Sequence, residues 1–379
     1  MNIKEMTPVK VAIYRCGTSK AIFIHKNDLP KDRETRDRVI LSIFGSPDPR
    51  QIDGLGGAEV LTSKLGIISP PSVPDADVDF TFGQVDIETP FISYSGLCGN
   101  VASGVASFAI EEGLVTAEEP FTTVRIYSTN TDQYYTTVVP VSGNSPKTLG
   151  DYVVPGVPGT GAKLSIDMSR TVGSYGKGLL PTGNPLDVFD IPGFGKLEGS
   201  LVDVVNPCLF IRADAVGLKG TEVKKTDFAA GQLELLETIR KVTFETIGKP
   251  YAEKDAVPFL AFVSEPTDYT NHLTGETVCG KDMDFVSRVL FLGGIHQTYP
   301  GSISCCTGAC AVIPGTVLHK IRGEKDDDKV IIGHPGGLID VEAVCETDEN
   351  GKPVIKKAAY ARTARRIMDG YCYVPSSLF

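Results

Sequence analysis

The first part of the chain consists of short runs of apolar and other β-favouring residues separated by turns, a pattern that predicts β-strands. Six segments predict strands in this way, at residues 9–14, 21–24, 65–68, 77–85, 123–127 and 134–141. Two other segments follow helical spacing. One starts at Asp28, the expected N-cap because Pro30 follows in the first turn, and runs to Phe44. The other covers residues 101–113, directly after Cys98, where small residues would let a helix pack closely inside a curved sheet.

The second part of the chain starts the same kinds of pattern again. Strands are predicted at residues 201–205, 209–213, 251–263, 329–332, 338–345 and 354–361. Helices are predicted at residues 232–247 and 283–292, with a short one after Cys306. Proline and glycine cluster at residues 155–161 and 173–195, so we expect a boundary near 180–190, between one domain at 1–185 and another at 186–379. Both halves are mixed α/β.

Composition narrows the class of protein. The 379 residues are 41% hydrophobic and 22% charged, as in an ordinary globular protein, and suffice for about two domains. The net charge of −10 argues against a nucleic-acid surface, although local groups can still bind a small dicarboxylate. No run of about 18 apolar residues predicts a membrane span, and the N-terminus lacks the apolar core of a signal peptide. Nine cysteines, an odd number, favour a reducing cytoplasm over a disulfide framework.

Cys98 is the strongest candidate for chemistry. It lies in the run Ser95-Gly96-Leu97-Cys98-Gly99-Asn100, immediately before a predicted helix. A helix start offers unpartnered N–H groups and the positive end of the helix dipole, and both favour thiolate over thiol. A small buried cysteine at a helix start is also a common structural feature. The flanking glycines, which permit close approach of a ligand, and Asn100 favour the functional interpretation.

Lys64 and the turn at residues 17–20 are the next candidates. Lys64 directly precedes an apolar run, so partial burial would let it act as a base, whereas most single lysines are solvated surface charges. The turn offers N–H groups and the hydroxyls of Thr18 and Ser19 to an anion. It lacks the spacing of a nucleotide-binding loop, and the glycine-rich residues 53–57 lack the context of a dinucleotide site.

A second cysteine-rich run contains Cys305, Cys306 and Cys310. Its spacing does not match common zinc sites, and no paired His or Cys motif accompanies it, so we expect no metal. The N–H groups of residues 307–309 (Thr307, Gly308 and Ala309), at a predicted helix start, fit carboxylate binding better.

Three residues of the second half have two open interpretations. His296 and His334 lie in glycine-lined turns, and Asn206 precedes a proline after a strand. Each is either a substrate contact or a structural residue of its turn.

Several long motifs together resemble a known family. They are Arg15-Cys16-Gly17-Thr18-Ser19-Lys20, residues 45–57, Leu61-Thr62-Ser63-Lys64, Tyr94-Ser95-Gly96-Leu97-Cys98-Gly99-Asn100, Leu180-Pro181-Thr182-Gly183, Asn206-Pro207, His334-Pro335-Gly336-Gly337 and Arg362-Thr363-Ala364-Arg365-Arg366. Through most of its length the chain resembles the PrpF-type methylaconitate isomerases of the diaminopimelate epimerase-like superfamily.

The resemblance implies an α/β (α+β) fold of two topologically similar domains. Each would be a β-sheet wrapped around a central helix, with the active site in the cleft between them. It implies no pyridoxal phosphate, metal or nucleotide, a small dicarboxylate substrate and a homo-oligomer. It places catalysis at Lys64 and Cys98. The expected substrate contacts are Thr18, Ser19, Ser63, Gly99, Asn100, Asn206, His296, Thr307, Gly308 and Ala309.

The implied reaction is a 1,3-proton shift that moves a C=C bond in an alkyl-substituted unsaturated dicarboxylate, of the type that converts 3-methylitaconate to 2,3-dimethylmaleate. We expect Lys64 to be the base and Cys98 the acid, although the reverse is chemically possible. Arg15-Cys16-Gly17 replaces a pair of glycines usual in the family, and residues 297–300 differ from the usual run after His296. Both departures favour a substrate other than methylaconitate.

Three alternatives stay open. One is a methylaconitate cis–trans isomerase. A second is a racemase or epimerase that uses Cys98 and Cys305 as opposed thiols, because Cys305 falls where epimerases of the superfamily keep their second catalytic thiol. A third is a non-catalytic accessory to an aconitase-like enzyme, which the cysteine cluster could serve.

Overall fold

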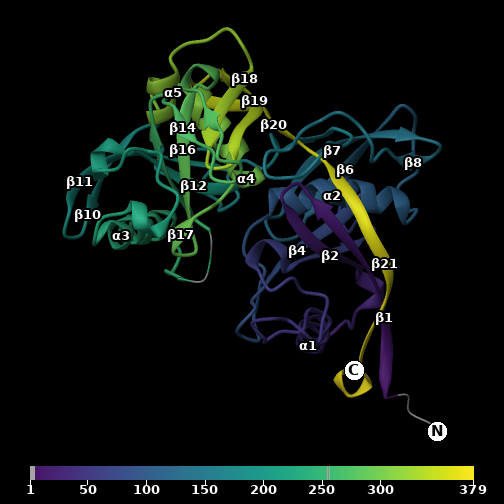
Figure 1. Ribbon diagram of the computed structural model, residues 1–379. Helices are drawn as coiled ribbons and strands as arrows, with labels where there is room; N and C mark the ends of the chain where they lie inside the picture. The colour runs from purple at the N-terminus through teal and green to yellow at the C-terminus, as the bar shows by residue number, and fades with distance from the viewer. Residues whose placement is uncertain (1–4, 254, 256) are drawn as a thin grey trace. The chain divides into compact units, whose positions relative to one another are not determined.

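The computed structural model describes residues 5–379 except 254 and 256. The chain divides into two compact units (Figure 1). The first comprises Met1–Ile166 together with Arg362–Phe379, and the second comprises Asp167–Ala361. Residues 167–185, which we expected in the first domain, therefore group with the second unit, and the segment after Ala361 groups with the first.

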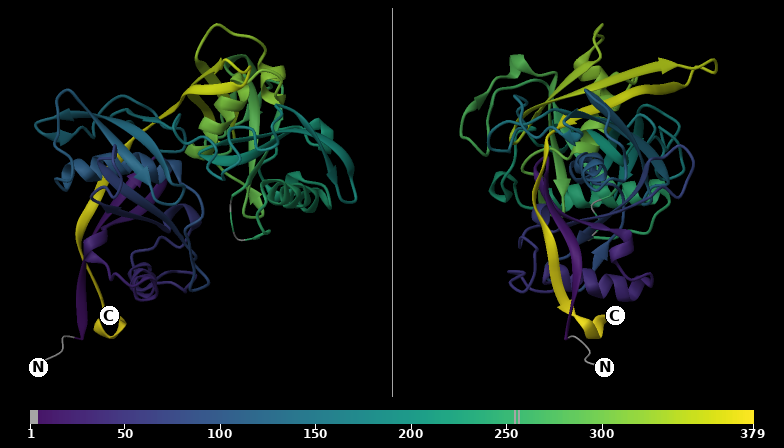
Figure 2. Two further views of the ribbon diagram at one scale, coloured as in Figure 1. Left: turned by 180° about the vertical axis from the view of Figure 1, so that it is seen from behind. Right: turned by 90° about the vertical axis from the view of Figure 1, so that its right-hand side faces the viewer.

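The first unit is built on a mixed sheet whose strands were mostly predicted. Its strands are β1 (Met6–Cys16), β2 (Ser19–His25), β3 (Lys64–Ser69), β4 (Val78–Val85), β5 (Ile92–Ser93), β6 (Phe121–Ser128), β7 (Gln133–Ser142), β8 (Ser145–Pro146) and β21 (Ala364–Pro375), with β9 (Leu164–Asp167) at the division. β2 pairs in parallel with β3, and β4 with β6, while β1–β2, β3–β4 and β6–β7 are antiparallel. β21 pairs with β1 along its whole length, as the yellow and purple strands show (Figures 1 and 2).

Helices cover both faces of this sheet. Helix α1 (Arg33–Phe44) buries Val39, Ile40, Ile43 and Phe44 against one face. Its N-cap is Asp32, whose carboxylate accepts the Thr35 N–H at 2.9 Å, so our prediction of Asp28 was wrong. Residues Lys26–Asp28 form a separate 3-10 turn, and Pro30 therefore precedes the helix rather than opening it.

Helix α2 (Gly99–Glu111) packs on the other face and is buried from Gly99 to Ile110. In the right-hand view of Figure 2 it is seen nearly end-on, with strands of its unit around it. Its Phe108 ring packs edge-on against Phe23 of β2, with ring centroids 5.5 Å apart. A helix buried on all sides needs small residues where strands pass closely. The small residues of α2 allow this packing, as the sequence predicted.

The second unit repeats this strand order. Its strands are β10 (Asp187–Ile191), β11 (Gly195–Val204), β12 (Asn206–Arg212), β13 (Phe259–Ser264), β16 (Phe285–Phe291), β17 (Gly294–Ile295), β18 (Lys329–His334), β19 (Gly337–Thr347) and β20 (Pro353–Arg362), with a small hairpin of β14 (Tyr269–Thr270) and β15 (Thr277–Val278). β12 pairs in parallel with β13, and β16 with β18, while β11–β12, β13–β16 and β18–β19 are antiparallel. The two units thus have the same succession of parallel and antiparallel neighbours.

The helices of the second unit occupy equivalent places in the chain. α3 (Gln232–Ile247), between β12 and β13, corresponds to α1 and has the predicted bounds. α4 (Gly301–Val312), which precedes β18, corresponds to α2 and is buried from Gly301 to Ala311. A short helix, α5 (Val317–Arg322), follows it. Each unit is therefore a sheet around a central helix, as the resemblance implies.

Two helix predictions in the second unit were wrong. Within residues 283–292, Phe285–Phe291 form strand β16. Both faces of this strand are buried, Ser287 and Arg288 included, so it shows no apolar–polar alternation, and its apolar residues Val286, Val289 and Leu290 follow helical spacing. The helix expected to begin after Cys306 begins at Gly301, with Pro300 as its N-cap. Among the described residues, no helix is long and apolar enough to cross a membrane.

Gly104 of α2 lies very close to the sheet. A Cβ at this position would lie 2.4 Å from Cys16 Sγ and 3.1 Å from the Phe23 ring. Burial raises the pKa of the Cys16 thiol, which is therefore a neutral packing group.

We predict that Gly104→Ala destabilises the protein by about 1–3 kcal/mol, because overpacking at Cys16 outweighs the better helix propensity of alanine, about 1 kcal/mol. In a Cys16→Ala background the same substitution should have little effect or stabilise. Urea unfolding of the four proteins of this cycle measures both values. An equal loss in the two backgrounds would contradict the contact.

Asp203, on β11, is a fully buried carboxylate in the second unit. Its oxygens accept the Ser174 hydroxyl at 2.6 Å and the Tyr175 N–H at 3.0 Å. Burial raises its pKa to about 6, although these hydrogen bonds oppose the shift. The native protein therefore holds a proton on Asp203 at pH values where the unfolded chain has lost it.

We predict that Asp203→Asn changes the pH dependence of stability. A pKa raised from 3.8 to about 6 lowers wild-type stability as pH rises from about 4 to 6, by about 3 kcal/mol, and asparagine removes this loss. The free energy of unfolding of the variant relative to wild type should therefore rise over that interval and then stay level. Asp190→Asn, at an exposed carboxylate, is the control.

Candidate active site

Lys64, the predicted base, begins strand β3 and is 4% exposed. Its Nζ donates to Gln84 Oε1 at 3.0 Å and lies 5.6 Å from the centre of the Phe82 ring. No carboxylate of a described residue forms an ion pair with it. The ammonium is thus buried with a neutral acceptor and an aromatic face, and an anionic ligand would supply its missing counter-charge.

Strand register places Ser19 on the same face as Lys64. Ala21 pairs with Lys64 across the parallel β2–β3 ladder, and paired residues share a face. Ser19 lies two residues before Ala21 and therefore points the same way. Its hydroxyl oxygen is buried and has no hydrogen-bond partner in the described part of the chain. A buried hydroxyl without a partner is unfavourable unless a ligand or a water molecule forms a hydrogen bond with it.

Cys98 is the N-cap of α2, which packs on this same face. Its thiol makes no capping hydrogen bond and is partly exposed. The segment before it is held by Asn130, whose Nδ2 donates to Phe82 O at 2.9 Å and to Tyr94 O at 2.8 Å. The structure therefore places the predicted acid at a helix start on the side of the sheet that carries Lys64.

Thr18 and Asn100 bind each other. Asn100 Nδ2 donates to Thr18 Oγ1 at 3.0 Å, and Asn100 Oδ1 accepts Arg362 Nε at 3.0 Å. Gly17 is required here, because its φ is +53° and a Cβ would lie 2.4 Å from Asn100 Oδ1. These contacts fix the start of α2 to the β1–β2 turn, while substrate contact by Thr18, Gly99 and Asn100 stays a prediction.

Ser63 contacts Gln51 through its side chain. The Ser63 hydroxyl is fully buried and donates to Gln51 Oε1 at 2.7 Å, and the same oxygen accepts the Ala58 N–H at 2.7 Å. This links the glycine-rich stretch to the residue directly before Lys64. The contacts give Ser63 a structural role, and its predicted contact with substrate is untested.

The predicted residues of the second unit are also engaged in their turns. His296 Nδ1 accepts the Thr298 N–H at 3.2 Å, and His334 Nδ1 accepts the Gly336 N–H at 3.1 Å. Asn206 is fully buried and follows Val205, whose φ of +67° is rare for a β-branched residue. Substrate contact by Asn206 and His296 stays a prediction.

The basis for Thr307, Gly308 and Ala309 as carboxylate donors is removed, because they lie inside α4 rather than at its start. Thr307 Oγ1 donates to Ile303 O at 2.7 Å, in the manner of a mid-helix residue. Cys305 is likewise internal and fully buried, and its Sγ donates to Ala358 O at 3.2 Å. The residue of α4 equivalent to Cys98 is the N-cap, Pro300, which has no thiol.

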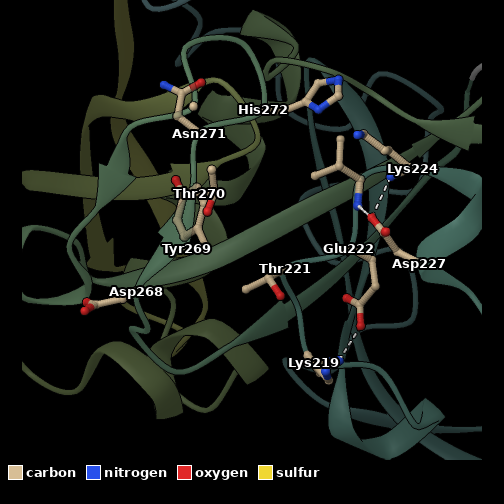
Figure 3. Close-up of a pocket in the computed structure, with 12 residues that line it drawn as sticks. Lys219, Thr221, Glu222, Lys224, Asp227, Asp268, Tyr269, Thr270, Asn271 and His272 are labelled. Carbon is tan, nitrogen blue, oxygen red and sulfur yellow. Dashed lines mark hydrogen bonds between the residues drawn. The ribbon is translucent and has the colours of Figure 1, made fainter.

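A cavity of about 590 Å³ lies in the second unit between the loops around residues 219–227 and 268–275 (Figure 3). Its carboxylates serve the loops themselves: Glu222 accepts the N–H groups of Lys219 and Gly220, and Asp227 those of Val223 and Lys224. None of the predicted site residues lines it. Within the described ranges, no three His, Cys, Asp or Glu residues gather to hold a metal ion.

Two residues of the candidate site escaped sequence reasoning. Gln84 was absent from the candidates although it is a polar residue on the inward face of β4, after Phe80 and Phe82. That break in an apolar alternation was the available signal. Arg362 stood in a quoted motif without a role, and its contact with Asn100, 262 positions away in the sequence, has no local signal.

The repeated sheet around a central helix defines the class of protein. The same fold occurs in a solved probable proline racemase from Agrobacterium radiobacter, at a TM-score of 0.56 and 14% identity over 98% of this chain and 93% of that one. The chain is thus an α/β protein of the diaminopimelate epimerase-like fold.

The chain belongs to the PrpF protein family, whose model matches residues 6–375. It is 47% identical to the 3-methylitaconate isomerase of Eubacterium barkeri, over 98% of each chain. It is 36% identical to the 2-methyl-aconitate isomerase of Shewanella oneidensis, over 97% of each. A crystal structure of methylitaconate-delta-isomerase superposes with a TM-score of 0.84 at 45% identity, covering 99% of this chain and 97% of that one. The protein is an isomerase.

We predict that Ser19→Ala keeps or raises stability, because it removes a buried hydroxyl without a partner, while kcat/KM falls about 10- to 100-fold through loss of a hydrogen bond to a charged substrate. Ser103→Ala is the matched control, since that buried hydroxyl already donates to Asn100 O at 2.7 Å. In the Ser103→Ala control, the free energy of unfolding should fall while kcat/KM changes little. Unchanged kcat/KM in Ser19→Ala would remove Ser19 from the site.

Proposed function

We propose that the protein moves a C=C bond in a small alkyl-substituted unsaturated dicarboxylate by a 1,3-proton shift, of the 3-methylitaconate to 2,3-dimethylmaleate type. The observation that carries the proposal is the surroundings of Lys64. A buried lysine amine without a carboxylate partner, a buried hydroxyl without a partner and a helix start lie on one side of one sheet. These groups suit a substrate that brings negative charge.

In the proposed reaction, neutral Lys64 removes the proton from the carbon that bears one carboxylate next to the C=C bond. The electron pair of that C–H bond forms a dienolate, whose charge on the carboxylate oxygens would be stabilised by the Ser19 hydroxyl and N–H groups at the start of α2. Cys98 then donates its proton to the far methylene carbon, which becomes a methyl group. The double bond has moved, and proton return from Lys64 to Cys98 restores the enzyme.

The relatives support this substrate class. The 3-methylitaconate isomerase of Eubacterium barkeri is the more similar of the two relatives compared, at 47% against 36% identity for the 2-methyl-aconitate isomerase. Because the second relative is a 2-methyl-aconitate isomerase, methylaconitate isomerisation is the alternative function. A two-thiol racemase lacks support, because Cys305 is inside α4 and fully buried. An accessory role to an aconitase-like enzyme lacks support, because Cys305, Cys306 and Cys310, the cysteine cluster that could serve it, are fully buried within α4.

We also propose that the protein works in the cytoplasm as a homo-oligomer. All nine cysteines are free, which suits a reducing compartment. Light scattering after size-exclusion chromatography tests the oligomeric state.

The function is tested by incubating the protein with itaconate-type and aconitate-type acids in D2O and following deuterium uptake by NMR. We predict exchange and isomerisation of a methylitaconate-type acid without added cofactor. Lys64→Ala and Cys98→Ser should each lose at least about 100-fold in turnover. Cys305→Ala, outside the proposed machinery, should retain proton exchange if the fold survives, which circular dichroism monitors. Full turnover by either of the first two variants would overturn that assignment, and a preference for aconitate-type acids would select the alternative.

A further inference from the structure

Gln84 is the one hydrogen-bond partner that the described structure gives to the Lys64 ammonium, at 3.0 Å. β3 and β4 are antiparallel, and Lys64 pairs directly with Gln84, so the two side chains are neighbours on one face. The acceptor is uncharged. A glutamate at this place would form a buried ion pair instead.

The amide of Gln84 is held in one orientation. Its Nε2 donates to Val60 O at 3.1 Å and to Ser63 O at 3.0 Å. Two carbonyl oxygens need a donor on that side, and the ammonium needs an acceptor on the other, so a flipped amide would lose all three contacts. Oε1 therefore faces Lys64 by necessity.

The fold itself does not require this polar pair. β12 pairs Cys208 with Phe259 as β2 pairs Ala21 with Lys64, so Phe259 occupies the equivalent position in the second unit. Phe291 stacks on Phe259 with ring centroids 6.4 Å apart, in the place of Gln84. Since a sheet of the same topology fills these positions with two phenyl rings, the lysine and glutamine serve another purpose than packing.

We propose that Gln84 is a positioning residue for Lys64, an inference that rests on Lys64 as the base of the proposed function. The amide accepts an N–H from Lys64 in either protonation state, and the lone pair of the neutral amine then points away from Gln84. Because the acceptor carries no charge, it fixes the nitrogen while holding the proton on it less strongly than a carboxylate would. The negative charge beside Lys64 is left for the substrate to supply.

Few other charged or titratable groups face Lys64. Strands β2 and β4 place Ser19 and Phe82 on this face, and α2 carries no charged residue from Gly99 to Ile110. The groups on the packed elements are the thiols of Cys16 and Cys98, the phenols of Tyr14 and Tyr135, the guanidinium of Arg362, which is bound to Asn100, and Glu111. Glu111, the carboxylate among them, ends α2 and accepts the Tyr14 hydroxyl and Arg366 Nε, so a carboxylate placed at position 84, directly beside Lys64, would dominate the local field.

The test is the pH dependence of kcat in two variants of opposite effect. Gln84→Glu should move the ascending limb of the profile to higher pH by about one to three units, because a carboxylate holds the proton on Lys64, and activity should recover at high pH. Gln84→Met, of similar length and without an acceptor, should move the limb to lower pH and lower the plateau. Gln232→Glu, which adds the same charge at the start of α3, is the control and should leave the limb in place.

The outcomes separate the two proposals. If Lys64→Ala keeps full turnover, Lys64 is not the base and the proposed function fails in that part. If Lys64→Ala is inactive but neither Gln84 variant moves the limb, the positioning role is overturned while the base assignment stands. Equal losses at every pH would show a structural role only and would also overturn it. Opposite shifts in the two variants would support the inference.

Discussion

The close packing of helix α2 inside its own sheet is the constraint on which the site depends. The helix is buried from Gly99 to Ile110, and at Gly104 it approaches β1 so closely that even a methyl group would meet Cys16. A helix held in this way cannot slide or rotate without steric conflict. Its first turn, and Cys98 with it, is therefore fixed relative to the strands that carry Ser19, Lys64 and Gln84.

The two units share a topology but differ in chemistry at equivalent positions. In the first unit the sheet presents Lys64 beside Gln84, and in the second it presents Phe259 stacked on Phe291. The N-cap of α2 is Cys98, whereas that of α4 is Pro300. One copy of the fold thus carries the proposed proton-transfer groups, and the other has apolar side chains at the matching strand and N-cap positions. This asymmetry suits an enzyme with two unlike proton-transfer residues better than one with two opposed thiols.

Much of the fold could be predicted from local pattern, because α3 has a clear helical period and most strands are β-rich runs bounded by turn residues. Residues 283–292 could not, since β16 is buried on both faces, polar Ser287 and Arg288 included, and therefore lacks the alternation that distinguishes a strand from a helix. The start of α4 was misplaced because its N-cap is Pro300, whose side chain gives no capping signal, and the glycine, serine and cysteine residues of its first turns do not mark a helix.

The candidate site shows the same division between local and distant signals. Cys98 and Lys64 were identifiable from their flanking residues and from the family resemblance. The pairing of Lys64 with Gln84 depends on strand register, and the bond between Arg362 and Asn100 joins distant parts of the chain. The Ser19 hydroxyl lacks a partner because of the arrangement of all its neighbours in space. No local stretch of sequence predicts this.

The ladder between β1 and β21 sets the order in which the molecule can be completed during synthesis. β1 leaves the ribosome first, yet its partner β21 follows only after the whole second unit, Asp167–Ala361. Val374 of β21 belongs to the same core as α1 and β1, so that core is open until the strand arrives. The second unit is contiguous in the chain and can fold while the first still waits. The unit that carries Lys64 and Cys98 is thus the later of the two to close, and the nascent chain must keep one long strand edge unpaired without aggregating.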